Sequence, residues 1–203
     1  MAPGWPVVLA DGDVLLRPLR RRDAREWLAL RAANASWLAP WEASSPVEMS
    51  GPAPTFGGFV RSLAGQAREG TSLPFAVDYD GRLAGQLTVS GITYGSLRSG
   101  TIGYWVGQHV AGHGVIPTAV ALATDHCFGV LGLHRVEINI RSENGPSLRV
   151  VEKLGFRDEG VRERYLHIAG SWRDHRTFAL TAEEVPSGLL ARWHERTAGP
   201  ALS

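Results

Sequence analysis

Apolar and polar side chains alternate strictly between residues 136 and 141 of the chain. Val136, Ile138 and Ile140 share one face of an extended segment, and the polar residues between them share the other. This period predicts a half-buried strand over Val136 to Arg141. Apolar runs bounded by turn residues predict six further strands: Asp13 to Leu19, Leu73 to Tyr79, Leu83 to Ile92, Thr101 to Val106, Arg162 to Ile168 and Trp172 to Leu180. Asp80-Gly81 and Ala169-Gly170 predict tight hairpin turns.

Other segments repeat apolar residues every three or four positions, which is the period of one buried helical face. Trp27, Leu30 and Ala33 have this spacing, and Asp23 with Glu26 three residues later predicts a capping pair at the helix start. Four further helices are predicted: Phe56 to Arg68, a segment from Val115 with Pro117 in its first turn, a stripe of Leu148, Val151 and Leu154 ended by Gly155, and Pro186 to Arg196.

The predicted order of elements is β-α-α-β-β-β-α-β-α-β-β. This order indicates a mixed α/β fold, in the α+β sense, with helices covering a largely antiparallel sheet. The Ser-, Pro- and Gly-rich stretch from Ser44 to Pro54 is predicted to be a mobile connection. We expect a single domain over residues 1–203, with a core over 13–181 and a C-terminal extension over 182–203.

Composition excludes several classes of protein. A hydrophobic content of 44% argues against disorder, and a net charge of +1 gives no reason to expect nucleic-acid binding. No apolar run approaches the roughly 18–20 residues of a membrane helix, and the N-terminus lacks the pattern of a signal peptide. Cys127 is the only cysteine, so no internal disulfide forms. It falls in an apolar helical pattern and is interpreted as a core residue. These features predict a cytoplasmic protein.

The candidate chemistry begins where the strand ending at Val106 runs into a glycine-rich loop, Gly107 to Gly114, followed by a helix. Free backbone N–H groups and the positive end of a helix dipole suit a pyrophosphate. The loop is not a Walker motif and lacks the Gly-x-Gly-x-x-Gly form of a dinucleotide site. The histidines and the single cysteine show no spacing typical of a metal site, so no metal is expected.

A second segment, residues 143–156, follows the strand that ends at Arg141. Together the two segments resemble the GNAT acyltransferases, and among them the branch of ribosomal-protein alanine N-acetyltransferases (RimJ/RimL-like). The resemblance covers roughly Val14 to Thr181. The residues that carry it are His109, Gly112 and Gly114 in the loop, and Asn144, Ser147, Glu152, Lys153, Gly155 and Phe156 in the second segment.

The resemblance implies a GNAT fold whose fourth and fifth strands splay apart around acetyl-CoA or another acyl-CoA. The strand residues Tyr104, Trp105 and Val106 would form one wall of that site and Asn144 the other. The loop implied to hold the pyrophosphate by its backbone comprises His109, Val110, Ala111, Gly112, His113, Gly114 and Val115. Two histidines depart from the family pattern, because His109 replaces the usual Arg or Gln and His113 the common Lys or Arg.

The catalytic groups are implied by the same resemblance. Ser147 matches the serine that assists departure of the CoA thiolate, whereas Val151 stands where other branches have a tyrosine. Ser147 could alternatively be only a helix-start residue, and Asn144 only the N-cap. The general base is less well defined: Thr101 replaces the family's strand glutamate, and Glu42 is the expected substitute.

Trp41, Glu42 and Tyr165 are the residues expected to face the acceptor. Structural hydrogen bonds are the expected role of Asp174 and His175 in the closing hairpin. The expected reaction transfers acetyl from acetyl-CoA to a primary amine, favouring a ribosomal or other protein N-terminus. A small-molecule amine such as an antibiotic, a succinyl donor and a catalytically inactive CoA-binding sensor are the alternatives. A homodimer is left open, with neither nucleic acid nor membrane expected as a partner.

Overall fold

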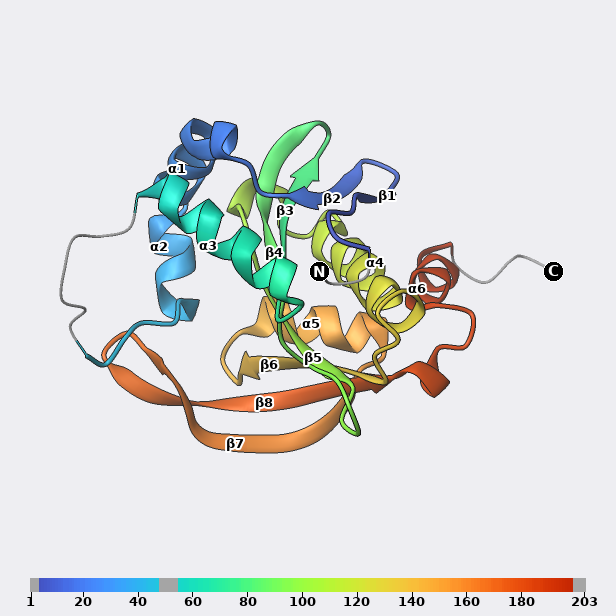
Figure 1. Cartoon of the computed structure of the whole chain (residues 1–203). Helices are drawn as coiled ribbons and strands as arrows, with labels where there is room; N and C mark the ends of the chain where they lie inside the picture. Colours follow the sequence, from blue (N-terminus) through green and yellow to red (C-terminus); the bar gives the residue numbers. More distant parts are fainter. Residues whose placement is uncertain (1–3, 48–54, 199–203) are drawn as a thin grey trace.

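A computed structural model describes residues 4–47 and 55–198. Its centre is an eight-stranded sheet in the order β1-β2-β3-β4-β5-β6-β8-β7 (Figure 1). The strands are β1 (Leu9–Asp11), β2 (Val14–Pro18), β3 (Leu73–Tyr79), β4 (Arg82–Thr93), β5 (Ser99–Val106), β6 (Arg135–Arg141), β7 (Arg157–Ile168) and β8 (Ser171–Thr181). All neighbours pair antiparallel except β5 and β6, which confirms the largely antiparallel sheet.

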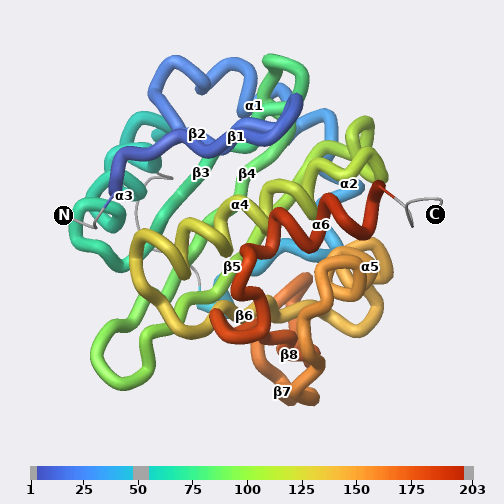
Figure 2. Tube along the Cα trace, turned by 90° about the vertical axis from the view of Figure 1, so that its right-hand side faces the viewer, coloured from blue at the N-terminus to red at the C-terminus, as the bar shows by residue number. Residues whose placement is uncertain are grey.

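Helices cover both faces of the sheet, as expected. The helices are α1 (Ala24–Ala33), α2 (Ala35–Leu38), α3 (Phe56–Glu69), α4 (Val115–Gly129), α5 (Gly145–Leu154) and α6 (Leu189–Thr197), with 3-10 turns at Arg21–Asp23, Ala39–Trp41, Gln108–Val110 and Ala182–Glu184. α1 and α3 pack on one face around Val60 and Leu83. On the other face α4, α5 and α6 lie side by side over the larger core (Figure 2).

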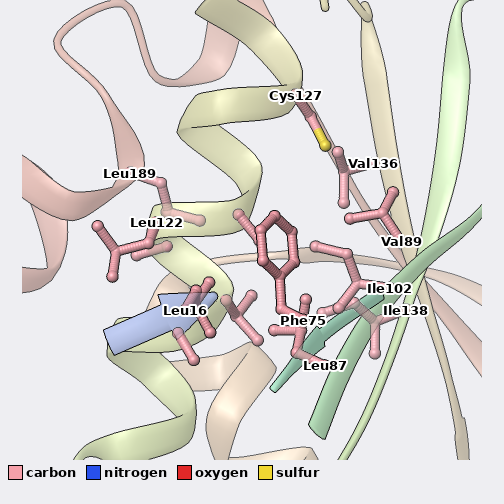
Figure 3. Close-up of a cluster of buried hydrophobic side chains, with 14 of the residues drawn as sticks. Leu16, Phe75, Leu87, Val89, Ile102, Leu122, Cys127, Val136, Ile138 and Leu189 are labelled. Atoms are coloured by element: carbon pink, nitrogen blue, oxygen red, sulfur yellow. The ribbon is translucent and has the colours of Figure 1, made fainter. Parts of the chain in front are cut away.

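Phe75 is at the centre of the larger core and is completely buried. Leu16, Leu87 and Ile102 from neighbouring strands surround it, and α4 covers it (Figure 3). Cys127 belongs to the same cluster, and burial raises the pKa of its thiol to about 12. The interpretation of Cys127 as a core residue is therefore confirmed.

The feature that matters most for the site is the short contact between β5 and β6. The two strands pair parallel only where Ser99–Thr101 meets Arg135–Glu137. Beyond these three residue pairs they separate, although β5 stays paired with β4 to Val106 and β6 with β8 to Arg141. The splay expected between the strands at 101–106 and 136–141 is thus confirmed.

Local details differ from the sequence-based expectation. β1 is an additional strand, β7 begins at Arg157 rather than Arg162, and α6 begins at Leu189 rather than Pro186. Asp23 occupies the N-cap position of α1, as expected, but the capping pair with Glu26 is wrong. Asp23 Oδ2 accepts from Arg20 N and Arg17 Nη1, and Glu26 accepts from Leu83 N. Both predicted turns are confirmed by left-handed backbone at Asp80-Gly81 and Ala169-Gly170.

The predicted mobile connection from Ser44 to Pro54 lies outside the described residues beyond Val47. Among the helices that the structure describes, none is long and apolar enough to cross a membrane.

Candidate active site

The glycine loop presents unpaired backbone amides to the start of α4. Gly112 and Gly114 adopt positive φ angles of 89° and 80°, a region that glycine enters without steric cost. Within the described residues, the N–H groups of Gly112 and Gly114 donate to no backbone carbonyl. Val115 and Ile116 open the 15-residue helix α4, so their N–H groups lack intrahelical partners as well. The loop therefore offers four donors at a positive helix end.

These amides border a cavity of about 120 Å³ between β5, α4 and α5. It is lined by Tyr104, Val106, Val110, Ala111, Gly112, Gly114, Val115, Ile116, Pro117, Pro146, Ser147, Arg149, Val150 and Lys153. The structure thus brings most of the expected cofactor residues together.

The loop histidines lie elsewhere. The His109 ring packs over Gly107, and the His113 ring stacks on Tyr79 with centroids 6.4 Å apart. Neither lines the cavity, so their imidazoles do not supply its positive charge. That charge comes from Arg149 and Lys153, which sequence reasoning missed. Their spacing of four residues on one face of α5 was the signal that could have identified them.

A second cavity, of about 260 Å³, fills the splay between β5 and β6. Its walls are Ile102, Gly103 and Tyr104 of β5, Ile138, Asn139, Ile140 and Arg141 of β6, and Trp41, Asn144, Ser147, Leu166, Ile168 and His175. Tyr104 and Ser147 line this cavity and the one at the glycine loop, so the two cavities adjoin. Asn144 caps α5 by accepting from Ser147 N at 3.1 Å, which confirms its capping role and leaves the Ser147 hydroxyl free of that task.

Tyr104 and Ser147 place two hydroxyl groups where the cavities meet. The Tyr104 hydroxyl is buried and has no hydrogen-bond partner of regular geometry among the described residues. Burial raises its pKa to about 12, and the nearby Ser147 side chain acts in the opposite direction. Tyr104 is therefore a neutral donor at physiological pH. A buried, unsatisfied hydroxyl is costly in a closed protein, which indicates a place where a polar ligand atom fits.

A third cavity, of about 410 Å³, lies on the other side of β5. It shares Trp41, Gly103 and Tyr104 with the cavity in the splay. Glu42 lines it and forms an ion pair with Arg31. Trp105 lines it as well, with the Arg31 guanidinium 5.0 Å from its ring centroid. The Trp105 side chain therefore lies on this side and not with the expected cofactor residues.

The segment from Pro40 to Ser44 contacts β6 at one end and β7 at the other. Arg141 Nη1 donates to Pro40 O at 2.7 Å, and its guanidinium lies 5.5 Å from the Trp41 ring centroid. At the other end, Ser44 N donates to His167 O at 2.9 Å, next to an isolated bridge between Ala43 and Ile168. This holds Trp41 where the second and third cavities adjoin, and Glu42 at the wall of the third.

The remaining candidates occupy different places. Tyr165 lines none of the three cavities and packs edge-on against the His175 ring at 5.5 Å. His175 is 4% exposed and lines the cavity in the splay. Its Nδ1 is hydrogen-bonded to Arg173 O at 3.0 Å. Thr101 lies in the short paired part of β5 and borders none of the cavities. Across residues 4–47 and 55–198, no cluster of three or more His, Cys, Asp or Glu side chains could hold a metal ion.

Comparison with known proteins agrees with this geometry. Residues 13–157 match the family model of the acetyltransferase (GNAT) domain. The chain is 32% identical over 176 residues to the probable N-acetyltransferase YjcK of Bacillus subtilis, covering 85% of this chain and 96% of that protein. It is 29% identical over 186 residues to the [ribosomal protein uS5]-alanine N-acetyltransferase of Escherichia coli, covering 90% and 94%.

Among solved structures, Mycobacterium smegmatis RimJ in complex with CoA-disulfide has a TM-score of 0.87 and 41% identity, covering 95% of each chain. The similarity therefore extends beyond the family model to β7, β8 and α6. The chain belongs to the GNAT family and is an N-acetyltransferase of the RimJ/RimL-like group.

Proposed function

We propose that this enzyme transfers the acetyl group of acetyl-CoA to the N-terminal α-amine of a protein. The observation that carries the proposal is the meeting of three cavities at Tyr104. One has free amides and two cations, the next lies between unpaired strand edges, and the third opens toward Trp41 and Glu42. This succession suits a phosphorylated donor, a reactive thioester and an acceptor amine, in that order.

The residues present fit acyl-CoA. The four free amides of the loop, with Arg149 and Lys153 beside them, suit the pyrophosphate. A Cβ built on Gly112 meets nothing within 4 Å, so the loop leaves open space where a phosphate would approach the backbone. The amide-bearing arm of CoA suits the facing edges of β5 and β6, which pair with each other only up to Thr101 and Glu137.

Ser147 is placed to support the departing thiolate, because it lines both the loop cavity and the splay. Its hydroxyl, next to the neutral Tyr104 hydroxyl, can donate to sulfur as the carbon–sulfur bond breaks. A strand amide of β5 near Val106 would polarise the thioester carbonyl. Acetyl-CoA supplies the activated acyl group when bound, and no metal is part of the proposed mechanism.

The acceptor side favours a peptide over a polyamine. Its cavities contain Arg31, Arg141 and a single carboxylate, Glu42, which already pairs with Arg31. A multiply charged cation would find no excess negative charge there. An α-amine has a pKa of about 7.7–8.0, so a useful fraction is neutral at physiological pH. The proposal also places the enzyme in the cytoplasm. A possible homodimer is part of the proposal, supported by the outer edge of β7, the last strand in the order of the sheet, which within the described residues is covered only at His167 and Ile168.

The proposal is tested with a panel of peptides that differ at the N-terminus, using mass detection of acetylated product. We expect acetylation of free α-amines, beginning with Ala-initiated peptides, and no product from the same peptides with a blocked N-terminus. Acetylation of lysine side chains or small amines alone would contradict the protein N-terminal assignment. Binding of CoA without turnover on any amine would favour the sensor.

The glycine loop gives a second prediction. Gly112→Val should abolish the rise in melting temperature that acetyl-CoA produces, which corresponds to about 2.7 kcal/mol at a concentration of 100 Kd. Gly81→Val is the matched control, because Gly81 also has a positive φ, 71°, and open space around its Cβ position. It should lower the melting temperature but keep the acetyl-CoA shift. If acetyl-CoA raised the melting temperature of Gly112→Val as much as that of wild type, the loop would not be part of the acetyl-CoA site.

The cations of α5 give a third prediction. Arg149→Ala and Lys153→Ala should each weaken acetyl-CoA binding about three- to tenfold, with a larger effect at low ionic strength. His113→Ala should leave the affinity unchanged, because its ring stacks on Tyr79 away from the cavity. Calorimetric titration at two salt concentrations measures all three. A loss of acetyl-CoA affinity in His113→Ala alone would mean that His113, and not Arg149 or Lys153, supplies the positive charge at the phosphates.

Ser147→Ala should lower kcat by about 10²–10³ while acetyl-CoA affinity and melting temperature stay close to wild type. The stability should hold because the α5 cap is the Asn144 side chain on the Ser147 backbone N–H, which alanine retains. Asn144→Ala is the stability control and should lose about 1 kcal/mol of unfolding free energy. Wild-type turnover in Ser147→Ala would contradict the role of Ser147 as the donor to the departing thiolate.

A further inference from the structure

We propose that His175 is the general base that accepts the proton of the attacking amine. This inference rests on the proposed acyl transfer and adds to it the group that the family pattern leaves missing at Thr101. The sequence-based expectation placed His175 among structural hydrogen bonds of the closing hairpin. The structure instead puts it on the wall of the reaction cavity, together with Tyr104, Asn144 and Ser147.

The position of His175 follows from its place in β8. This strand pairs with β6 from His175 to Thr181, and His175 stands opposite Arg141 at the end where β6 has separated from β5. Two residues further along β8, and so on the same face, Thr177 donates to Asn139 Oδ1 at 2.8 Å. Asn139 also lines the cavity. The face of β8 that carries His175 is therefore directed into the splay.

The hydrogen bonds of the ring fix which nitrogen can act. Nδ1 lies 3.0 Å from the carbonyl oxygen of Arg173, and a carbonyl only accepts, so Nδ1 carries the proton. Nε2 is then the unprotonated acceptor, and it has no hydrogen-bond partner within the described residues. The Tyr165 ring packs edge-on against the imidazole and holds its orientation.

Burial and the neighbouring charged groups keep the His175 imidazole neutral, so that it can still accept a proton. Burial lowers the pKa of His175 below its usual 6.5, the Arg173 carbonyl raises it, Arg141 lowers it, and Glu143 and Asp174 raise it. The Arg141 guanidinium is itself occupied by Glu143 and by Pro40 O. A neutral imidazole is the form that can accept a proton at physiological pH.

Glu42 is less suited to the same task. Its carboxylate is engaged by Arg31 and lines the third cavity, whereas the cavity in the splay does not include it. An ion-paired carboxylate would have to give up that contact to take a proton. The geometry therefore assigns to Glu42 the positioning of the acceptor and to His175 the uptake of the proton from the attacking amine.

The proton balance of the step is complete. The amine nitrogen forms a bond to the thioester carbonyl carbon, and its surplus proton passes to His175 Nε2. The carbon–sulfur bond breaks with its electron pair going to sulfur, and the thiolate takes a proton from Ser147 Oγ. Ser147 recovers its proton from solvent, and His175 releases one to solvent, so amide and free thiol are the only products.

The test is the pH dependence of kcat with a free N-terminal peptide, because an unprotonated base gives activity above its pKa that is lost as pH falls. The peptide α-amine itself gives one acidic limb near its pKa of about 7.7–8.0, and wild type should lose further activity on a second acidic limb below about pH 6.5. His175→Asn keeps a donor near the Nδ1 position but has no titrating acceptor. It should lose about 10²–10⁴ in kcat together with that limb, with an unchanged KM for acetyl-CoA.

Two matched variants complete the design. His134→Asn alters a half-exposed histidine that contacts Glu183, and its profile should equal that of wild type. Glu42→Gln should raise the peptide KM while keeping the acidic limb. Retention of the second acidic limb in His175→Asn, or its loss in Glu42→Gln, would overturn the proposal. Wild type without turnover on any N-terminal peptide would instead overturn the proposed function, and with it the role of His175.

A direct measurement covers the case in which His175→Asn does not fold. In ¹⁵N-histidine-labelled wild type, His175 is recognised by its contact with the Tyr165 ring. At pH 7 we expect the tautomer with the proton on Nδ1, and a shift of the Nε2 resonance when the acceptor peptide is added. A proton on Nε2, or no response to the peptide, would overturn the proposal.

Discussion

The site depends on one constraint: β5 and β6 are held together at only three residue pairs and are then held apart. Each strand keeps a full partner on its outer edge, β4 in one case and β8 in the other. The inner edges therefore present backbone donors and acceptors to a cavity inside the molecule. Such groups are costly when left unpaired, so the opening is stable only because the rest of the fold enforces it and a polar ligand can satisfy it.

Two helices enforce the opening from its wide end. α4 begins directly after β5 and its loop, and α5 begins directly after β6, so each separating strand leads into a helix start at the same cavity. α6 packs on both helices and is anchored by Asp125, whose carboxylate accepts from the N–H groups of Leu189 and Leu190. Arg192 and Arg196 bind carbonyl groups at the end of α5. The packing of α4, α5 and α6 therefore holds β5 and β6 apart.

Local patterns predicted most of the fold, and long-range contacts account for what they missed. Alternation at residues 136–141 and the turn at Asp80-Gly81 are set by neighbours in sequence, so they could be read directly. Asp23 stands at the N-cap position of α1, but its carboxylate does not cap the helix, because its partners, Arg17 and Arg20, come from the preceding strand and turn. In the site, the loop and Ser147 were found through their motifs. The spacing of Arg149 and Lys153 places both on one face of α5, but the cavity that this face borders is set by tertiary packing. The pairing of Glu42 with Arg31 and the junction at Tyr104 depend on tertiary packing as well.

The strand order also sets when the enzyme can come into being. β8 inserts between β6 and β7, although it is made after both. Until it emerges from the ribosome, β6 has only its three residue pairs with β5, and His175 is missing from the wall of the cavity in the splay. A nascent chain therefore exposes the outer edge of β6 from the synthesis of Arg141 until β8 follows. The wall of the reaction cavity is complete only once this last strand has been made, and the unpaired strand edge exposes the chain to aggregation until then.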